Sequence, residues 1–432
     1  MEQQYLIKTL FSEGKYDEIV KLYDNDEAVS SFNRWDYYYT IRAFYKLGDY
    51  DGCENVFMAL LETGLEILPQ TDDIFGWALY QKYLKGLSND NPADEETLKA
   101  LDWIFVCTSD DPMSPRWKSL LKYGKTKKAD PELLNKYLDT IDPKSLSNES
   151  TNSYNIRGRQ TPDASDRENW YKLKSNALFE LGDFDGCIKI IEEAFSDIPE
   201  FHFNNDIWLN NRLITVYMIQ GKYDEAESKL NEVLVLAKKK NVKHWIFEQH
   251  KFDICVHKGD VEGALKHGSI CSITDNSHEM RVGFYLKFAE YLQSQGYEKE
   301  ATLHCRLVQL IREERAWSEV EMPSNVSMEG EYAEMDKGPV LKELGKFWMD
   351  QANKGKQFKT GTVKKILANG FAGFVTEDSS GSDYYFSMNE FVNRRQRDDV
   401  YEGARIRFVL EERMDRKKGE MKLNAVEISL IQ

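Results

Sequence analysis

Residues Leu47–Cys53 of this chain read LGDYDGC, and Leu181–Cys187 read LGDFDGC. Aligned on the first glycine, the same pattern recurs as EGKYDEI at Gly14, QGKYDEA at Gly221, KGDVEGA at Gly259 and QGYEKEA at Gly296. Gly14 and Gly48 are 34 residues apart, and the four glycines from Gly182 onward follow one another at 39, 38 and 37 residues. A period in this range predicts a stacked array of helical hairpins.

Each position of the pattern has a physical role in such a hairpin. The glycine ends one helix where the backbone turns back tightly. An aromatic residue follows two positions later in four of the six copies. Five positions after the glycine stand mostly small side chains, which allow two helices to approach closely: Ile19, Cys53, Cys187, Ala226, Ala264 and Ala301. We therefore interpret Cys53 and Cys187 as small core residues and not as reactive thiols.

With its G-x-Y-x-x-A turn, the chain resembles the tetratricopeptide repeat family over residues 168–315 and 1–63. Between 64 and 142 the glycine turn is missing, although 75–83, 98–107 and 117–123 have helical apolar spacing. The resemblance implies an α-solenoid of helical hairpins. Arrays of this kind act through their shape, with a groove that binds a protein or a peptide segment.

The pattern divides the chain into five segments. Residues 1–142 are expected to form an N-terminal helical lobe, degenerate after about residue 64, and 168–315 the second set of repeats. The polar, turn-rich segment 143–167 predicts a long loop or linker between them. A linker and a capping helix, with helical spacing over 338–353, occupy 316–355, and an all-β domain follows at 356–432.

Charge is distributed unevenly along the chain. The formal net charge is −16. The first 355 residues, with 43 Lys+Arg and 61 Asp+Glu, have a net charge of −18, and the remaining residues have a net charge of +2. The remainder is mildly basic, so a polyanionic partner is expected to bind there. The sequence shows neither a secretory signal nor an apolar run long enough for a membrane helix. The six cysteines are scattered singly, which favours reduced thiols in a cytoplasmic protein.

The C-terminal segment changes from helical to alternating periodicity. Five short strands in about 75 residues fit a small barrel of the oligonucleotide-binding type. The order GTVKKI, GFAGFV, DYYFSMNEF, EGARIRFVLEE and KGEMKLNAVEI resembles the cold-shock domain across 359–428. An RNA-binding barrel repeated in a large ribosomal protein is a near neighbour, since GTVKKI also suits its first strand. The resemblance implies that aromatic side chains on one face stack on unpaired bases of RNA or DNA.

Carried over position by position, the cold-shock motifs match only in part. Phe374 and Tyr385 stand where the family has base-stacking aromatics, whereas Lys365 replaces the tryptophan of the first strand and Ser387 a histidine. Ala372 stands at the first motif's other aromatic, for which Phe371 substitutes if the strand bulges. Basic residues are expected to track phosphates. The candidate nucleic-acid-binding residues are Lys364, Lys365, Phe371, Phe374, Tyr385, Ser387, Arg405, Arg407, Lys417 and Lys418.

Chaperone-binding members of the repeat family hold a terminal carboxylate in a clamp. The resemblance implies Lys and Asn on one helix and Asn on the next. Lys172 and Asn176 match the first pair, but Arg212 stands where the second Asn belongs. The sequence therefore disfavours this clamp.

Two further patterns are set aside. Tyr123–Lys127 reads YGKTK, but a phosphate-binding loop needs a glycine where Ser119 stands and a preceding strand where the pattern is helical. Three histidines lie close together in sequence with a cysteine between them, yet no pair has the i, i+4 spacing of a metal site: His244, His250, His257 and Cys255. No catalytic constellation, metal site or cofactor site is predicted.

These patterns favour a non-enzymatic adaptor that binds a protein through its repeats and single-stranded nucleic acid, RNA more than DNA, through its C-terminal domain. One alternative is a pure protein scaffold whose barrel does not bind nucleic acid. Another is a regulator whose groove senses a peptide. The sequence does not identify the partner or the oligomeric state.

Overall fold

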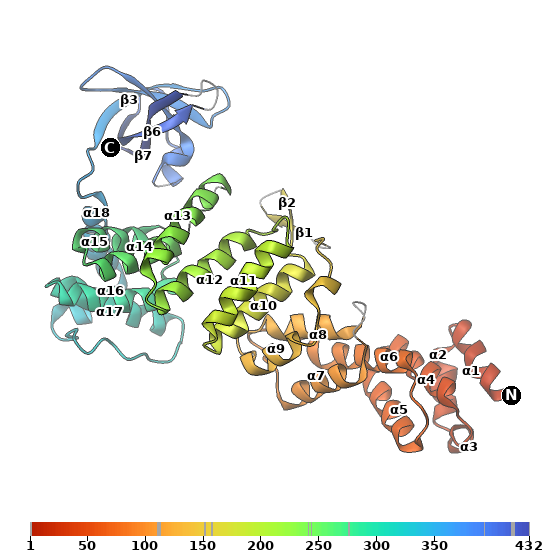
Figure 1. The fold of residues 1–432 in the computed structure, drawn as a ribbon. Coiled ribbons are helices and arrows are strands. Elements are labelled where there is room, and N and C mark those ends of the chain that lie inside the picture. Colours follow the sequence, from red (N-terminus) through yellow and green to blue (C-terminus); the bar gives the residue numbers. More distant parts are fainter. Residues whose placement is uncertain are drawn as a thin grey trace. The chain divides into compact units, whose positions relative to one another are not determined.

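A computed structural model of the chain describes residues 2–109, 114–150, 153–156, 159–240, 242, 244–274, 277–392, 394–415 and 420–431. The chain divides into two compact units, Met1–Lys243 and His244–Gln432, called here the N-terminal and C-terminal units. Each unit is treated by itself. Eighteen α-helices are found in the described residues, and a five-stranded sheet lies near the C-terminus (Figure 1).

The N-terminal unit is built almost entirely of helices. They are α1 (Glu2–Ser12), α2 (Tyr16–Tyr23), α3 (Asp26–Val29), α4 (Arg34–Leu47), α5 (Tyr50–Thr63), α6 (Pro69–Leu79), α7 (Glu95–Cys107), α8 (Pro115–Gly124), α9 (Pro131–Leu138), α10 (Asp166–Glu180), α11 (Phe184–Asp197), α12 (Asn205–Ile219) and α13 (Tyr223–Lys240). A π-helical turn, Tyr80–Leu84, extends α6, and a short hairpin of β1 (Ser153–Ile156) and β2 (Arg159–Pro162) precedes α10.

The C-terminal unit begins with more helices and ends in the sheet. Its helices are α14 (Trp245–Lys258), α15 (Val261–Ile273), α16 (Val282–Ser294), α17 (Glu298–Glu314) and α18 (Lys337–Asn353). Its strands are β3 (Lys359–Ile366), β4 (Ala372–Glu377), β5 (Asp383–Ser387), β6 (Arg405–Asp415) and β7 (Glu420–Leu430). Helices expected from the sequence over 338–353 and across 64–142 are thus present, as are the five expected strands.

The repeated LGDxDGC phrase forms the turn between two paired helices, α4 with α5 and α10 with α11. Gly48 adopts a left-handed conformation with φ of 78°, which an L-residue adopts only with strain. Asp49 then caps α5, because its carboxylate accepts a hydrogen bond of 2.8 Å from the backbone N–H of Gly52. A Cβ atom on Gly52 would collide with this carboxylate and with the Phe44 ring. The second copy repeats the arrangement, with a 2.9 Å cap at Asp183.

The cysteine that ends the phrase packs one helix against the other. Cys53 and Cys187 are fully buried, and each thiol donates to a carbonyl on the preceding helix, to Ile41 at 3.4 Å and to Ser175 at 3.3 Å. Burial raises the pKa of Cys53 to about 12 and that of Cys187 to about 11. Ionised, reactive thiols are therefore disfavoured at both positions. All six residues at this position of the repeat are buried: Ile19, Cys53, Cys187, Ala226, Ala264 and Ala301.

The polar segment 143–167, expected to be a loop or linker, is integrated into the N-terminal unit. Leu146 is buried in the same core that extends from Ile7 to Val216. The Arg167 guanidinium donates to the backbone oxygens of Lys144 (3.0 Å) and Leu146 (3.1 and 3.2 Å), which ties the segment to α10. The division between compact units falls instead at Lys243/His244, within the range 168–315. A separate core, beginning at Phe252, holds the C-terminal helices together.

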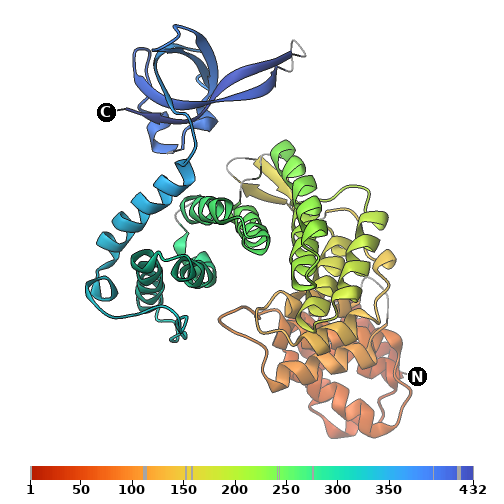
Figure 2. The same cartoon turned by 60° about the vertical axis from the view of Figure 1, so that its left-hand side comes forward.

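The five C-terminal strands form a closed sheet in the order β3-β4-β5-β7-β6, in which β6 also pairs with β3. We call this closed barrel the C-terminal sheet; Figure 2 shows the strands curving around a common centre. All pairings are antiparallel except β5 with β7, which is parallel. Its interior has a core of its own, which includes Val363, Phe386, Phe408 and Ile428. One bulge interrupts β3 between Val363 and Lys365.

Candidate nucleic-acid interface and partner groove

Three of the candidate residues form a row across the outer face of the C-terminal sheet. In the strand register Phe374 lies opposite Lys365 on one side and opposite Tyr385 on the other. The rings of Phe374 and Tyr385 meet edge to face, with centroids 5.9 Å apart and planes at 73°. Phe374 is half-buried and Tyr385 is 38% exposed, so part of this aromatic pair can reach a base. Edge-to-face rings also support each other's orientation.

A third aromatic residue stands beside this row. Phe371 is 75% exposed and lies immediately before β4, where Ala372 is buried. The β4–β5 pairing is regular from Ala372 onward, so the exposure of Phe371 does not come from a bulge in that strand. The bulge lies in β3 and gives Lys364 and Lys365 a single partner position on β4. Phe371 therefore reaches solvent because it ends the turn before the strand.

Two of the candidate cations are already paired with carboxylates of the sheet. Lys364 forms an ion pair with Asp383, and the Arg405 guanidinium contacts both oxygens of Asp378, at 3.0 and 2.7 Å. Arg407 stacks on the Phe358 ring, 4.3 Å from its centroid. Lys365 is exposed, and no ion pair to it is found in the part of the chain that the structure describes. Phosphates would have to compete with these carboxylates for the bound cations.

The remaining candidate residues, Ser387, Lys417 and Lys418, add no described contact surface for nucleic acid. The Ser387 hydroxyl accepts a hydrogen bond of 3.2 Å from the backbone N–H of Asn389 and caps a short 3₁₀ turn, Met388–Glu390. Lys417 and Lys418, predicted to contact phosphates, lie outside the described residues. The Phe358 platform under Arg407 was not predicted. Its only sequence signal is an aromatic residue directly before the first strand.

Carboxylates neutralise further cations of the sheet. Lys356 pairs with Glu427 at 2.5 Å, and Arg413 pairs with Glu390 at 2.8 Å. Lys359 pairs with Glu377, whose carboxylate also accepts hydrogen bonds from Ser379 and Ser380. The hydrogen bond from Lys359, followed by those from the serines, lowers the pKa of Glu377 to about 2. The net charge of the domain stays at +2, although five of its basic residues are thus paired with its carboxylates: Lys356, Lys359, Lys364, Arg405 and Arg413.

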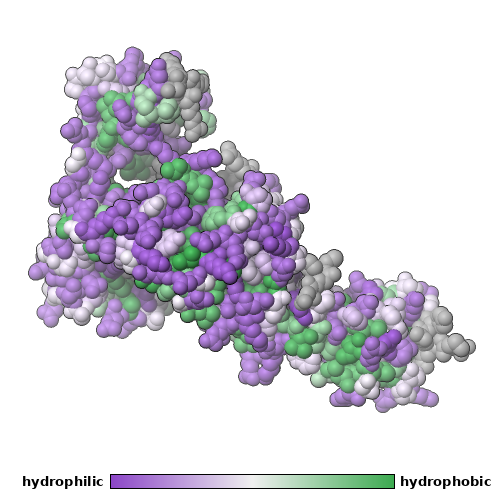
Figure 3. Space-filling view, viewed as in Figure 1, coloured by the Kyte–Doolittle hydropathy of each residue, from purple (hydrophilic) through white to green (hydrophobic). Residues whose placement is uncertain are grey.

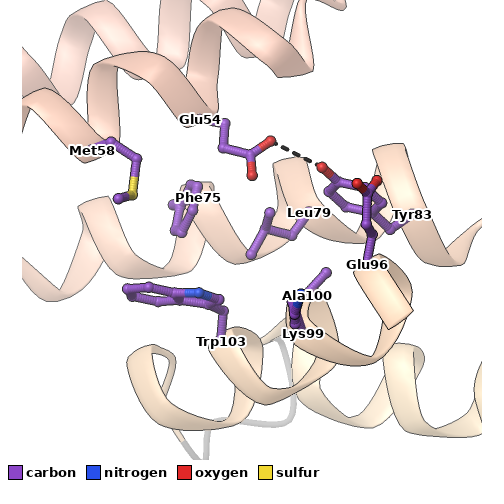
Figure 4. A pocket seen from close by; sticks show the side chains of 9 residues that line it. All are labelled: Glu54, Met58, Phe75, Leu79, Tyr83, Glu96, Lys99, Ala100 and Trp103. Carbon is purple, nitrogen blue, oxygen red and sulfur yellow. Dashed lines mark hydrogen bonds between the residues drawn. The ribbon is translucent and has the colours of Figure 1, made fainter. Parts of the chain in front are cut away.

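A hollow of about 240 Å³ opens among α5, α6 and α7 in the N-terminal unit. Its apolar side chains include Met58, Phe75, Leu79 and Trp103, of which Met58 is 45% and Trp103 39% exposed. Figure 4 shows these side chains around the hollow. Figure 3 shows hydrophobic residues gathered on the surface over the N-terminal helices, in the area where Figure 1 labels α4 to α6.

Acidic residues stand beside this apolar hollow. Glu54 and Glu96 both line it, and Glu54 accepts hydrogen bonds from Lys82 (2.7 Å) and from the Tyr83 hydroxyl (3.2 Å; Figure 4). Lys82 and Tyr83 belong to the π-helical turn Tyr80–Leu84, a rare conformation that occurs frequently at functional sites. The turn therefore orients Glu54 at the mouth of an aromatic hollow. Such a hollow fits one apolar side chain of a peptide next to a cationic one.

The residues considered for a carboxylate clamp are brought together, but Arg212 changes their chemistry. Its Nη2 donates to the Asn176 side-chain oxygen at 2.9 Å, so this amide is engaged inside the protein. Arg212 lies on α12, while Lys172 and Asn176 lie on α10. The bond occupies the Asn176 oxygen and not its N–H groups, so the departure from the clamp is Arg212 itself, which stands where the second Asn belongs.

The two patterns set aside from the sequence have structural explanations. Gly124 ends helix α8 and is not part of a strand–loop–helix unit; a Cβ atom on it would lie 3.0 Å from Leu173, so glycine permits this close approach. His250 is buried inside α14, and burial lowers its pKa to about 4. Within the described ranges, no group of three or more His, Cys, Asp or Glu residues is placed to hold a metal ion.

No known family model matches the chain, and no curated protein sequence is significantly similar to it. No described helix combines the length and apolar character needed to cross a membrane.

Proposed function

We propose that the chain is a non-enzymatic adaptor that binds a protein partner through its helical hairpins and single-stranded nucleic acid, RNA more than DNA, through its C-terminal sheet. In this proposal the helices form an α-solenoid of tetratricopeptide-like hairpins, and the sheet is an oligonucleotide-binding barrel of the cold-shock type. The adaptor would act in the cytoplasm. No cofactor takes part.

The observation that carries the nucleic-acid half is the row Lys365–Phe374–Tyr385 on the outer face of the sheet. An exposed cation beside two aromatic rings can neutralise a phosphate while a base stacks on the rings. With Phe371 nearby, the surface offers three aromatic side chains, and each stacked base contributes about 1–3 kcal/mol. Because the neighbouring cations are paired with carboxylates, modest affinity is expected.

The protein-binding half is supported by the hollow among α5, α6 and α7. Helical hairpin arrays bind extended peptides or helices in their grooves. The hollow offers an aromatic floor, including Phe75 and Trp103, and the carboxylate of Glu96. Glu54 is already paired with Lys82, and Lys99 also lines the hollow. A partner segment with an aliphatic side chain next to Lys or Arg would complement the aromatic floor and Glu96.

Fluorescence anisotropy of the full chain with labelled mixed-sequence RNA and DNA tests the nucleic-acid half. Phe374→Ala and Tyr385→Ala should each weaken binding by about 1–3 kcal/mol. Trp317→Ala provides the matched control, because Trp317 is also an exposed aromatic residue (42%) but lies outside the sheet. Absence of measurable binding at low salt, or equal losses in all three variants, would exclude stacking on this row.

A pure scaffold is the second candidate, and the end of the β6–β7 ribbon favours it. Met414 and Met421 are cross-strand partners, and they are 57% and 54% exposed. Leu423, on the same face of the ribbon, is 44% exposed. An exposed apolar ribbon face suits contact with another protein more than contact with phosphates. Should the anisotropy experiment find no nucleic-acid binding, this candidate becomes the better one.

A further inference from the structure

Arg212 places a guanidinium among neutral acceptors. Its Nη1 donates to the Ser175 hydroxyl (2.7 Å) and to the backbone oxygen of Lys172 (3.2 Å), and its Nη2 donates to Asn176 (2.9 Å). The side chain is partly buried between α10 and α12, and burial lowers its pKa. No carboxylate of the described chain forms an ion pair with it. Two of its five N–H groups, at Nε and Nη2, remain for a further acceptor.

Two lysines add positive charge at the same place. The Lys172 side chain is exposed, but nearby protein atoms partly desolvate its ammonium. This desolvation lowers the pKa of Lys172, and the charges of Arg212 and Lys125 lower it further. Asp163 and Glu168 oppose the shift but do not reverse it. Lys125 directly follows α8, where Gly124 packs closely on Leu173, the neighbour of Lys172. Lys172 on α10 is thus repelled by Arg212 on α12 and by Lys125 at the end of α8.

Other partly buried cations of the N-terminal unit, in contrast, form ion pairs with carboxylates. Lys174 contacts Asp139 at 2.6 Å, Lys240 contacts Asp206 at 2.6 Å, and Arg167 contacts Asp197 at 3.5 Å. Burying a charge without a counterion costs free energy of folding. An anion bound among Lys125, Lys172 and Arg212 would offset that cost, which the charges of Asp163, Glu168 and Glu180 offset only in part.

We propose that Lys125, Lys172 and Arg212 bind the phosphate group of a phosphorylated serine or threonine on a protein partner. A phosphoryl group carries nearly two negative charges and three acceptor oxygens, which match three cations better than a single carboxylate does. Arginine contributes a fork geometry suited to phosphate oxygens. The Asn176 amide N–H groups lie beside the same guanidinium and provide additional donors.

A phosphorylated protein segment fits this surface better than RNA does. Residues 1–243 contain 30 Lys+Arg and 42 Asp+Glu, so the N-terminal unit as a whole repels a long polyanion. On a segment that carries one phosphate and several basic residues, the phosphate is attracted by the local cations and the basic residues by the surrounding acids. The inference rests on the proposed protein-binding role of the helical hairpins, and it adds the chemical feature that they recognise.

The test uses the full chain and two labelled peptide pools with degenerate flanks, one with a central phosphoserine and the other with serine. In fluorescence anisotropy the phosphorylated pool should bind about tenfold or more tightly than its match, as charge-assisted hydrogen bonds predict. Lys125→Gln and Lys172→Gln should each remove most of this difference. Lys127→Gln is the control: it removes a lysine two residues from Lys125 and should leave the difference in affinity between the two pools unchanged. Inorganic phosphate at millimolar concentration should compete weakly.

Three outcomes would overturn the proposal. They are equal affinity for the two pools, unchanged phosphoserine preference in Lys125→Gln and Lys172→Gln, and competition by inorganic phosphate or mixed-sequence RNA as strong as competition by the phosphorylated pool. Since Lys125 is exposed and makes no described side-chain bond, its variant reports on binding even if Arg212→Gln fails to fold.

Failure of this proposal and failure of the proposed function are distinguishable. Loss of the phosphoserine preference leaves the RNA titrations of Phe374→Ala and Tyr385→Ala unaffected. A partner captured equally by the wild type and by Lys125→Gln would keep the protein-binding role while removing the phosphate site.

Discussion

The Trp348 indole on α18 donates a hydrogen bond of 2.9 Å to Nε2 of His304 on α17, and both side chains are buried. The other ring nitrogen of His304 lies 2.7 Å from the carbonyl oxygen of Glu300. Because Nε2 accepts from the indole, Nδ1 must carry the proton and donate to this carbonyl. Both ring nitrogens are thus satisfied only when the imidazole is neutral. The pair fastens the last helix to the helical array.

Replacing Trp348 by Phe should destabilise the C-terminal unit. The substitution removes the N–H donor and leaves the buried Nε2 of His304 without a partner, which costs about 1–3 kcal/mol. Urea unfolding followed by circular dichroism measures the loss. Trp317→Phe is the matched control, since Trp317 is 42% exposed, and its midpoint should stay near that of the wild type. Equal midpoints for both variants would mean that the buried hydrogen bond contributes nothing.

The same histidine makes stability depend on pH. Burial lowers the pKa of His304 to about 4, and burial, aided by the nearby Lys287, does the same for His250. In the unfolded chain both titrate near 6.5, so the unfolded state binds protons that the folded state refuses. Their contribution is therefore complete above pH 6.5 and declines as the pH falls from 6.5 towards 4. The slope approaches about 1.4 kcal/mol per pH unit for each histidine.

Urea midpoints measured between pH 7.5 and pH 5 follow this loss, above the range in which most carboxylates titrate. His250→Gln should reduce the pH slope by the share of one histidine, because that group no longer titrates. Burial raises the pKa of Asp72 to about 6, so this carboxyl contributes a slope of opposite sign in both proteins and cancels in the comparison. Equal slopes in the wild type and His250→Gln would show that His250 is not held neutral by the fold.

The left-handed turn glycines can be tested against helical ones. Gly221 has φ of 73°, Gly345 lies inside α18, and a Cβ atom on either would meet no atom within 4 Å. Gly221→Ala should destabilise by about 1–2 kcal/mol through backbone strain alone. Gly345→Ala should stabilise by up to about 1 kcal/mol, because alanine favours the helix. Shifts of the urea midpoint in the same direction would contradict the assigned turn geometry.

The sequence predicted the parts of the fold that depend on local chemistry. The repeated phrase predicts a glycine turn and a small core residue, and Gly48 and Cys53 have these roles, whereas the cap that Asp49 provides was not predicted. The unit boundary at Lys243/His244 was not predicted, since α13 and α14 follow the repeat pattern on both sides of it. Which core a repeated helix joins depends on packing and not on the phrase itself.

At the candidate site, the aromatic row was predictable and the charge pairing was not. Alternation along two strands places Phe374 and Tyr385 on one face, and motif order puts the strands side by side. The Lys364–Asp383 pair, in contrast, depends on a bulge in β3 that shifts the register by one residue. Similarly, nothing in the spacing of residues 75–83, which is helical, distinguishes the π-helical turn that orients Tyr83 towards Glu54.

The C-terminal sheet should fold without the helices. Its core, which includes Val363, Phe386 and Phe408, is separate from the core that contains Trp348. A fragment that begins at Lys354 keeps all five strands and should give an all-β circular dichroism spectrum with cooperative unfolding. A random-coil spectrum would show that the sheet needs the preceding helix.

The ion pairs of the C-terminal sheet make a specific prediction about salt. If phosphates bind mainly at Lys365 and Arg407, the log–log dependence of affinity on salt should have a slope of only about −0.7 for each of these contacts. Lys365→Gln should reduce the slope by one such contact, whereas Lys342→Gln on α18 should leave it unchanged. The fragment from Lys354 should bind more tightly than the full chain, because it lacks the first 353 residues, whose 42 Lys+Arg and 61 Asp+Glu give a net charge of −19.

Removing the carboxylate that holds Lys364 should have the opposite effect. Asp383→Asn frees the Lys364 ammonium beside the aromatic row and removes a negative charge that repels phosphate. Affinity for single-stranded RNA at low salt should therefore rise, and the slope should steepen by about 0.7. The exposed pair itself contributes at most about 1 kcal/mol to stability, so the fold should tolerate the change. Unchanged or weaker binding in this variant, with an unchanged unfolding midpoint, would place the phosphate path away from Lys364 and the row next to it.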